Sequence, residues 1–264
     1  MRGVALFSSA LPGWEAERVV DAARTLGLDA VEWGAGPGQA IESPDDGARI
    51  AALCRAAGLA VAGVAVQDPE VTLATPRSAA RFVALAGALR APHVRFFAPV
   101  YEGGSVGVAQ RRVRAGVDSL VTVAAAARIG VLVETSPGTL APSGSMALAL
   151  VGHHPAARAG VLYDPGNTVI EGYVSPALWV ARLGRHLRHV HVKNIAWSRR
   201  AGEWRWGYAT IDGGIVDWPQ TLRALAASGY RGRVSIDHLS GRPTVGLLRS
   251  ESGRLEELLA QAAG

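Results

Sequence analysis

Four short apolar segments in the second half of the chain carry side chains that could bind a divalent cation. Three end in a carboxylate and the fourth carries His191; the three are Val131-Leu-Val-Glu134, Val161-Leu-Tyr-Asp164 and Val234-Ser-Ile-Asp237. Carboxylates that lie close together without partners repel one another, and a divalent cation removes that repulsion. Three carboxylate oxygens and one imidazole suit Mn²⁺ or Mg²⁺ best, with Co²⁺ or Zn²⁺ as alternatives.

The segment that carries His191 also carries Lys193, the only lysine among the 27 basic residues. Because arginine serves everywhere else, a lysine here indicates a position that needs a compact charge rather than a wide planar fork. The segment alternates, so that His189, His191 and Lys193 share one face of a strand while valines occupy the other. That face should line a polar interior. The alternative is a chance lysine on a solvated edge strand.

Short apolar segments alternate with longer amphipathic ones from end to end. The predicted strands are Val4–Phe7, Ala30–Trp33, Ala60–Val66, His93–Phe97, Gly130–Glu134, Gly160–Asp164, His189–Lys193 and Arg233–Asp237. The predicted helices are Trp14–Leu26, Pro44–Ala57, Pro76–Leu89, Ala109–Arg128, Ser143–Val151, Pro176–Leu183, Trp218–Ser228 and Thr244–Ala262. Strands that alternate with helices in this way indicate a parallel sheet.

Eight such units in 264 residues favour an α/β fold of the closed (β/α)₈ TIM barrel type, with residues 1–264 as a single domain. The alternative is a doubly wound open sheet, but no Gly-rich dinucleotide fingerprint follows the first strand after Phe7. In a barrel, the carboxyl ends of the strands meet on one rim, where barrel enzymes carry their active sites. The sequence therefore predicts one metal site on that rim, formed by Glu134, Asp164, His191 and Asp237.

Further polar residues are candidates for the same pocket. Glu32 ends the second predicted strand, and Arg95 shares one face of the fourth strand with Phe97. Either could bind substrate, or the two could form a structural ion pair. Ile195–Ile211 is rich in arginine and tryptophan and is predicted to be the longest irregular segment; a loop of that length after a barrel strand is usually functional. We expect it to close over the substrate, with Arg200 attracting a carboxylate or phosphate; the alternative is a contact in a homodimer or homotetramer.

Bulk composition favours a cytoplasmic enzyme that acts on a small polar molecule. The chain is 49% hydrophobic and 19% charged, enough to bury a sizeable core. No apolar run reaches the roughly 18–20 residues that a membrane span needs, and the N-terminus lacks a signal-peptide pattern. A single cysteine, Cys54, excludes an internal disulfide framework. The net charge of +5 is spread along the chain without a basic run, so neither nucleic acid nor a membrane is an expected partner.

Three segments of the chain carry recognisable motifs, and they read His189-Val-His-Val-Lys-Asn194, Ile211-Asp-Gly-Gly-Ile-Val-Asp-Trp218 and Gly229-Tyr-Arg-Gly-Arg-Val-Ser-Ile-Asp237. They are similar to the patterns HxHxKD, GxGxxD and GYxGxxSIE, and with them the chain resembles the xylose-isomerase-like family of sugar and sugar-phosphate isomerases and epimerases. The resemblance covers essentially the whole chain. It implies a (β/α)₈ barrel with one divalent metal ion held by Glu, Asp, His and Glu, which correspond here to Glu134, Asp164, His191 and Asp237.

The chain departs from that family at three positions. Asp237 stands where the family usually has Glu, and the shorter side chain retracts the carboxylate by about one C–C bond, roughly 1.5 Å. In the family's ketose 3-epimerases this group and the strand-five glutamate also shuttle the proton, so the resemblance makes Glu134 and Asp237 catalytic candidates. Asn167 stands where many members have a substrate-binding His, and Asn194 replaces the usual Asp.

The expected function is that of a divalent-metal-dependent isomerase or epimerase acting on a sugar, a sugar phosphate or a related polyhydroxy-keto substrate. The metal would chelate adjacent oxygens and acidify the neighbouring C–H, with Glu134 as base and Lys193 as candidate acid. The same first step serves a dehydratase (lyase) acting on a cyclic polyol or keto substrate. A non-catalytic ligand-binding or accessory barrel is an alternative of another class, and phosphodiester cleavage is the least favoured. The expected substrate-binding residues are Glu32, Arg95, Asn167 and Arg200.

Overall fold

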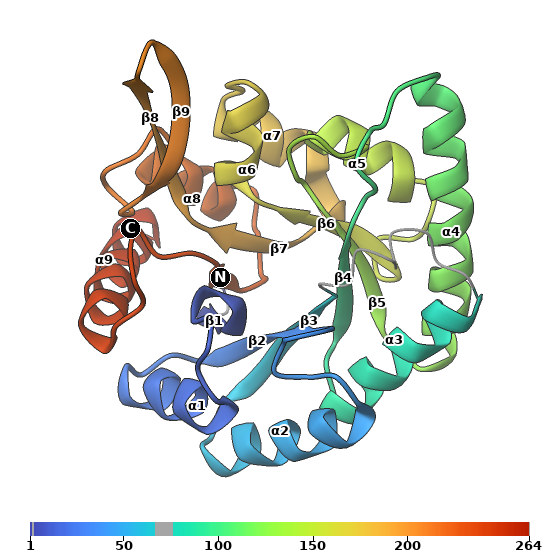
Figure 1. Ribbon diagram of the computed structural model, residues 1–264, viewed down its shortest axis with the longest axis horizontal. Helices are drawn as coiled ribbons and strands as arrows, with labels where there is room; N and C mark the ends of the chain where they lie inside the picture. Colours follow the sequence, from blue (N-terminus) through green and yellow to red (C-terminus); the bar gives the residue numbers. More distant parts are fainter. Residues whose placement is uncertain (2, 67–75, 264) are drawn as a thin grey trace.

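Eight parallel strands close into a barrel, as the sequence predicts (Figure 1). The computed structural model describes residues 1, 3–66 and 76–263. Going round the barrel, the strands follow the order β1-β10-β7-β6-β5-β4-β3-β2, and each pair of neighbours is parallel. Their bounds are β1 Val4–Phe7, β2 Ala30–Ala35, β3 Ala60–Val66, β4 His93–Phe97, β5 Gly130–Glu134, β6 Ala159–Tyr163, β7 Leu187–Val192 and β10 Val234–Ile236. Because all eight strands are parallel, their carboxyl ends meet on one rim.

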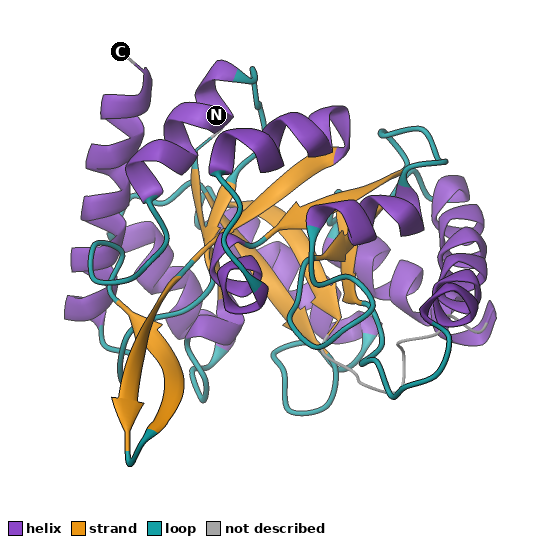
Figure 2. Ribbon diagram, turned by 90° about the horizontal axis from the view of Figure 1, so that it is seen from above, coloured by secondary structure: helices purple, strands orange, loops and turns teal. Residues whose placement is uncertain are grey.

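Helices surround this barrel (Figure 2). They are α1 Ala16–Thr25, α2 Pro44–Ala56, α3 Pro76–Leu89, α4 Val106–Ala126, α5 Gly144–Val151, α6 Pro165–Glu171, α7 Pro176–Leu183, α8 Trp218–Ala227 and α9 Val245–Ala263. The helix α2 begins with a complete capping box, in which Ser43 and Asp46 each accept a hydrogen bond from the other's backbone N–H. Among the helices of the described residues, none combines the length and the apolar character that a membrane crossing needs.

The main apolar core lies between the barrel strands and the helices. Strand β7 shows how the alternating sequence divides its side chains: Val190 and Val192 pack in this core. His189 and His191 are at most 2% exposed and lie on the other face of the strand, inside the barrel. The predicted polar interior is thus confirmed for β7, and its polar face continues into the buried Lys193.

Two segments differ from the sequence prediction. The segment Ile195–Ile211 is not irregular: most of it forms an antiparallel hairpin, β8 Asn194–Arg200 and β9 Glu203–Ala209. The prediction overlooked a signal in β9, where Trp204, Trp206 and Tyr208 alternate with Glu203, Arg205 and Gly207 as in a strand. Most side chains of the hairpin are exposed, so its strands do not read as apolar barrel strands. The helix α6 was also missed, since it has only seven residues and begins with Pro165 directly after the aspartate that caps it.

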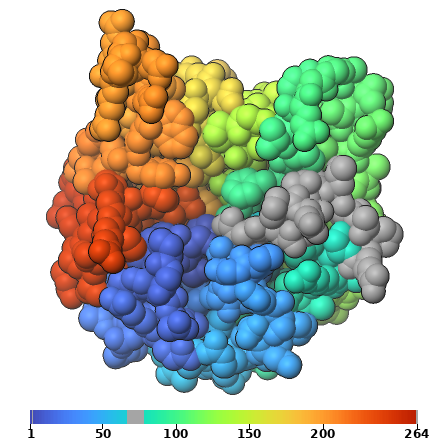
Figure 3. Space-filling view, viewed as in Figure 1, coloured from blue at the N-terminus to red at the C-terminus, as the bar shows by residue number. Residues whose placement is uncertain are grey.

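The hairpin stands out from the body of the molecule (Figure 3). Its turn, Ala201 and Gly202, has positive φ at both residues, 50° and 85°, as a two-residue hairpin turn requires. At its base Asn194 is buried: its side-chain oxygen accepts from the N–H of Val216, and its amide donates to the carbonyl of Ile211. A side chain at Gly214 would collide with Asn194, with a Cβ 2.1 Å from Oδ1. Asn194 therefore fastens the hairpin to the segment that leads into α8.

Candidate metal centre on the carboxyl rim

The four predicted metal ligands meet on consecutive strands of the barrel. Glu134 ends β5, Asp164 follows β6, His191 lies in β7 and Asp237 follows β10. Nδ1 of His191 lies 3.6 Å from Oε1 of Glu134, 4.0 Å from Oδ2 of Asp164 and 3.3 Å from Oδ1 of Asp237. The side chains of Glu134, Asp164 and His191 are buried, and that of Asp237 is partly buried at 11% exposure. One imidazole nitrogen thus faces three carboxylates in a space from which water is largely excluded.

Glu32 and His189 lie on the far side of the His191 ring. Nε2 of His191 is 3.0 Å from Oε2 of Glu32, and Nε2 of His189 is 3.1 Å from the same oxygen and 2.7 Å from Oγ of Ser235. Phe7 stacks on the His191 ring, with centroids 5.3 Å apart. A carboxylate that accepts from Nε2 fixes the tautomer and aims Nδ1 at the three ligand carboxylates. Glu32 thus contacts and orients the two histidines, and the contact with substrate expected for it stays a prediction.

The protonation of His191 shows how strongly this site attracts positive charge. Burial alone would lower the pKa of His191, but the carboxylates of Glu32, Asp237 and Glu134 outweigh burial and raise that pKa well above its ordinary value. Nδ1 is nevertheless buried without a hydrogen-bond partner in the part of the chain that the structure describes. This orphaned nitrogen, surrounded by carboxylate oxygens, is the arrangement expected of a metal ligand.

Lys193 lies between two of the ligand carboxylates. Its Nζ is 2.8 Å from Oδ2 of Asp164 and 2.7 Å from Oδ2 of Asp237. Burial would lower the pKa of Lys193, but these two aspartates and Glu134 raise it above its ordinary range, so the amine holds its proton. The surroundings are tight: a Cβ at Gly166 would lie 2.6 Å from Cγ of Lys193. The lone lysine therefore sits where a compact charge fits and a planar fork would be crowded.

Arg95 and Asn167 position Glu134. Nε of Arg95 is 2.8 Å from Oε2 of Glu134, and its guanidinium lies over the ring of Phe97 at 4.4 Å. The ion pair that the sequence allowed between Arg95 and Glu32 is therefore wrong, because the partner of Arg95 is Glu134. The amide of Asn167 donates to Oε1 of Glu134 at 3.2 Å, and its backbone N–H donates to Oδ1 of Asp164 at 2.9 Å. Both residues hold ligand carboxylates in place.

The charge of this group, hereafter the rim cluster, fits a divalent cation. It comprises four carboxylates, two permanent cations and one imidazole, namely Glu32, Glu134, Asp164, Asp237, Arg95, Lys193 and His191. With His191 neutral, the cluster has two more negative charges than positive ones. A divalent ion held by Glu134, Asp164, His191 and Asp237 would balance these two negative charges and would bind the free Nδ1 of His191. Without a metal ion, protonation of His191 would balance only one of the two charges.

The structure does not bring Arg200 to this site. Arg200 ends β8 beside the hairpin turn and is exposed, so it lies at the opposite end of the hairpin from Asn194. The base of the hairpin is nearer the rim: Tyr208 in β9 stacks on His238, the neighbour of Asp237, with ring centroids 3.3 Å apart. Closure over a substrate, which the sequence suggested for this segment, stays a prediction.

Sequence reasoning missed two small buried polar partners, Ser235 inside the barrel and Thr135 directly after β5. Ser235 contacts His189, and the hydroxyl of Thr135 accepts from the backbone N–H of Asp164 at 3.0 Å. A usable signal was present for Ser235, since it alternates with Val234 and Ile236 in a short strand and so points to the same interior.

Residues 20–258 match the family described as xylose isomerase-like TIM barrel, and the chain belongs to that family. No curated protein matches the sequence. The family assignment agrees with the closed barrel and with the resemblance seen in the three sequence segments.

Solved structures with the same fold span nearly the full chain at low identity. D-allulose 3-epimerase from Methylomonas sp. is 18% identical, with a TM-score of 0.76 and coverage of 98% of this chain and 97% of that one. A probable 3-DHS dehydratase, AsbF, from Bacillus anthracis is 18% identical, with a TM-score of 0.76 and coverage of 96% and 98%. A xylose isomerase-like protein from Mycobacterium smegmatis in complex with magnesium is 16% identical, with a TM-score of 0.73 and coverage of 100% and 98%. At these identities the likeness shows the fold alone.

Proposed function

We propose that the protein is a divalent-metal-dependent isomerase or epimerase acting on a sugar, a sugar phosphate or a related polyhydroxy-keto substrate. The observation that carries this proposal is the rim cluster, in which an imidazole nitrogen without a hydrogen-bond partner among the described residues faces Glu134, Asp164 and Asp237. Epimerases and a magnesium complex among proteins of the same fold support it. Mn²⁺ or Mg²⁺ suits the donor set best, because oxygen ligands predominate.

In this proposal the metal supplies Lewis acidity to adjacent substrate oxygens, which makes the C–H next to the carbonyl easier to ionise. Glu134 takes the proton from that carbon. Arg95 and Asn167 each hold one oxygen of the Glu134 carboxylate, which limits its rotation. Lys193 keeps its proton and donates a hydrogen bond toward a substrate oxygen that gains negative charge. Burial would raise the pKa of Asp237, but Lys193 and His191 outweigh burial and lower that pKa to about 2. The Asp237 carboxylate is therefore ionised, and the proton that returns on the other face comes from water beside it.

A second candidate reaction is β-elimination by a dehydratase, and the contacts of Asp237 favour it. Epimerisation by two bases needs a free carboxylate on each face of the carbon. Here the Asp237 carboxylate is engaged by Lys193 at 2.7 Å. Its shorter arm also stays nearer the strand end than a glutamate would. Loss of a β-hydroxyl needs only one base, Glu134, and one hydrogen-bond donor to the leaving oxygen, which Lys193 would be, while water supplies the proton. A dehydratase is also present among the proteins of the same fold.

Hydrogen–deuterium exchange at carbon tests both reactions at once. The protein, loaded with Mn²⁺, is incubated in D₂O with a panel of ketoses, ketose phosphates and cyclic keto-polyols, and the products are followed by NMR. Deuterium next to the carbonyl together with a new isomer supports the isomerase. A conjugated product that absorbs in the ultraviolet supports the dehydratase.

Glu134→Gln is the informative variant for this assay, with Glu257→Gln as its control, because Glu257 is an exposed partner of Arg254. The first should abolish exchange and the second should not. If metal is bound stoichiometrically but no substrate of either class exchanges a proton, both enzymatic proposals fail, and the barrel is then a ligand-binding protein.

A further inference from the structure

A polar cavity opens at the end of the barrel opposite the rim cluster. Its volume is about 670 Å³, within the roughly 300–1,000 Å³ typical of small-molecule sites. It is lined by residues at the amino ends of β3, β4, β7 and β10, including Ala62, His93, Arg188 and Arg233. In barrel enzymes this end usually serves stability, since the chemistry lies at the carboxyl rim. We call this space the mouth cavity.

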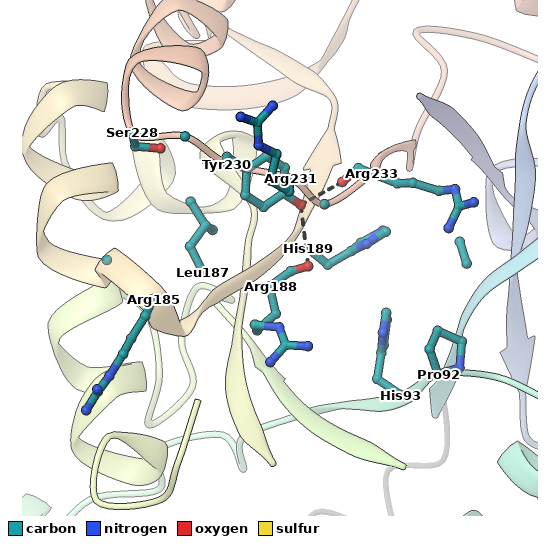
Figure 4. A pocket seen from close by; sticks show the side chains of 14 residues that line it. Pro92, His93, Arg185, Leu187, Arg188, His189, Ser228, Tyr230, Arg231 and Arg233 are labelled. Atoms are coloured by element: carbon teal, nitrogen blue, oxygen red, sulfur yellow. Dashed lines mark hydrogen bonds between the residues drawn. The ribbon is translucent and has the colours of Figure 1, made fainter. Parts of the chain in front are cut away.

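Four arginines line the mouth cavity: Arg185, Arg188, Arg231 and Arg233. Among the described residues 1, 3–66 and 76–263, no carboxylate forms an ion pair with any of these arginines. Arg188 donates a hydrogen bond to the backbone carbonyl of Ala156, which carries no charge. In Figure 4, Arg188 and Arg233 lie on either side of a hollow that also faces His93 and His189, while Arg185 and Arg231 extend away from it. The result is a concave surface with positive charge and no acidic partner in the described part of the chain.

Tyr230 fixes the two arginines that flank the hollow. Its buried hydroxyl donates to the backbone carbonyl of Arg233 at 2.7 Å and also lies 3.4 Å from that of Arg188, as the dashed lines in Figure 4 show. The strands β7 and β10 are hydrogen-bonded neighbours in register, with Val190 opposite Val234. A side chain at Gly232 would displace the tyrosine, since a Cβ there would lie 2.1 Å from its oxygen. The backbone of both arginines is therefore held by a dedicated side chain.

Two buried nitrogens at the mouth cavity have no hydrogen-bond partner among the residues that the structure describes. They are Nε of Arg233 and Nε2 of His93. The His93 ring reaches this place only because Gly63 leaves room for it; a Cβ at Gly63 would lie 2.3 Å from Nε2. Burial, and then the neighbouring His189, lower the pKa of His93 to about 3, so the ring is neutral and offers one N–H. Buried polar atoms without partners cost free energy that a bound ligand can recover.

We propose that the mouth cavity binds a phosphoryl group, with Arg188 and Arg233 as its principal ligands. A guanidinium presents a planar fork of N–H donors that matches two oxygens of a phosphate or phosphate ester. Arg185 and Arg231 raise the local concentration of anions from farther away. The cavity is larger than one phosphate, so a phosphorylated small molecule fills it better than the free ion. This site is separate from the rim cluster and does not depend on the reaction proposed there.

Isothermal titration calorimetry tests the site with inorganic phosphate, pyrophosphate and glycerol 3-phosphate, at constant ionic strength set with chloride. Wild type should bind at least one of these phosphates saturably, and acetate should not compete. Preference for glycerol 3-phosphate or pyrophosphate indicates a phosphorylated metabolite, and equal affinity for all three indicates free phosphate as the ligand. Arg233→Ala should weaken binding by about tenfold or more, because a charge-assisted hydrogen bond is lost.

Arg112→Ala is the matched control, because Arg112 is exposed on α4, away from the lining of the cavity. Its affinity for phosphate should equal that of wild type. Arg188→Gln provides a second variant in case Arg233→Ala does not fold, and it should weaken binding in the same way. Equal phosphate affinity in wild type, Arg233→Ala and Arg188→Gln would overturn the proposal, as would the absence of saturable binding in wild type.

Discussion

The two ends of the barrel are built on the same strands, yet they balance charge in opposite ways. At the carboxyl rim, four carboxylates face Arg95 and Lys193, and each of these cations is ion-paired. At the mouth cavity, four arginines have no ion-pair partner in the part of the chain that the structure describes. Strand β7 contributes to both ends, with Arg188 near its start and His191 near its end.

Uncompensated charge costs more free energy at the rim than at the mouth cavity, because the rim side chains are more deeply buried. The rim carboxylates are almost completely removed from water, so an uncompensated charge there is costly and the proposed cation would stabilise the folded site. Three of the four mouth arginines are exposed and keep their hydration when no anion is bound. A ligand at the mouth would thus be optional, whereas the proposed cation at the rim would contribute to stability as well as to the reaction. Changes at the rim should have the larger effects.

The largest effect is expected for His191→Ala. This change removes the only nitrogen among the four proposed ligands and takes away one partner of Glu32. Metal content should fall from about one ion per chain to a small fraction, and activity should fall by more than the roughly 10–100-fold typical of losing a supporting partner. Elemental analysis after gel filtration measures the first effect. Mn²⁺ should also raise the melting temperature of wild type but not of the variant, and equal metal in both proteins would refute the ligand assignment.

Lys193→Arg should lower turnover while the metal is retained. The arginine fork must enter the space between Asp164 and Asp237 beside Gly166, where the lysine already fits closely. A displacement of about 1 Å among the reacting groups can cost roughly 100-fold in rate, and we expect a loss of that order in kcat. Arg254→Lys, which alters an exposed ion pair with Asp212, is the control and should leave kcat unchanged. Wild-type turnover in Lys193→Arg would mean that the lone lysine is a chance feature.

Glu32→Gln tests whether the contact between Glu32 and Nε2 of His191 contributes to metal affinity. Glutamine keeps the shape but removes the charge that fixes His191 and His189, so metal affinity should fall about 10–100-fold with the ligands intact. Competition with a chromophoric chelator measures this affinity. Glu17→Gln, in an exposed pair with Arg49, serves as the control. If Glu32 instead binds substrate directly, metal affinity will be unchanged and only KM will rise.

The sequence predicted the rim better than the mouth for a physical reason. Carboxylates that end apolar strands stand out against their neighbours, so the pattern alone locates Glu134, Asp164 and Asp237. Arginines such as Arg185 and Arg231 follow no such pattern, and from the sequence they belong to a positive charge spread along the chain. Their convergence depends on β7 and β10 being neighbours, which joins segments more than forty residues apart in the chain.

The partners of the buried charged side chains also could not be predicted from the sequence. From the sequence, Arg95 could pair with any carboxylate at a strand end. The register of β4 with β5 places Phe97 opposite Glu134, and this brings Arg95 into an ion pair with Glu134. Asn167 could be assigned only by its likeness to a substrate-binding position, whereas its contacts with Glu134 and Thr135 depend on α6, which the sequence did not reveal.

Metal affinity should depend on pH with a definite sign. The pKa of His191 is raised in the metal-free protein, despite burial, by Glu32 and the ligand carboxylates, and burial raises the pKa of Asp164. A metal ion must therefore displace protons from the site, so metal affinity should rise with pH. For each proton displaced, metal affinity should change by up to about tenfold per pH unit. Titrations between about pH 6 and about pH 8 test this slope. Glu32→Gln should shift the rise to lower pH, and a flat profile in wild type would show that His191 is already neutral.

The smallest effect is expected for Arg200→Ala, which removes a cation that belongs to neither end of the barrel. Arg200 is exposed near the tip of the hairpin, so it can help an anionic substrate mainly by long-range attraction, worth about 0.5 kcal/mol or a two- to threefold change in KM. kcat, metal content and the molecular mass in solution should not change. Because exposed charges are screened, the difference in KM should vanish at high salt. A much larger rise in KM that persists in salt would mean that the hairpin closes over the rim, and a change in mass would instead make the hairpin a contact between subunits.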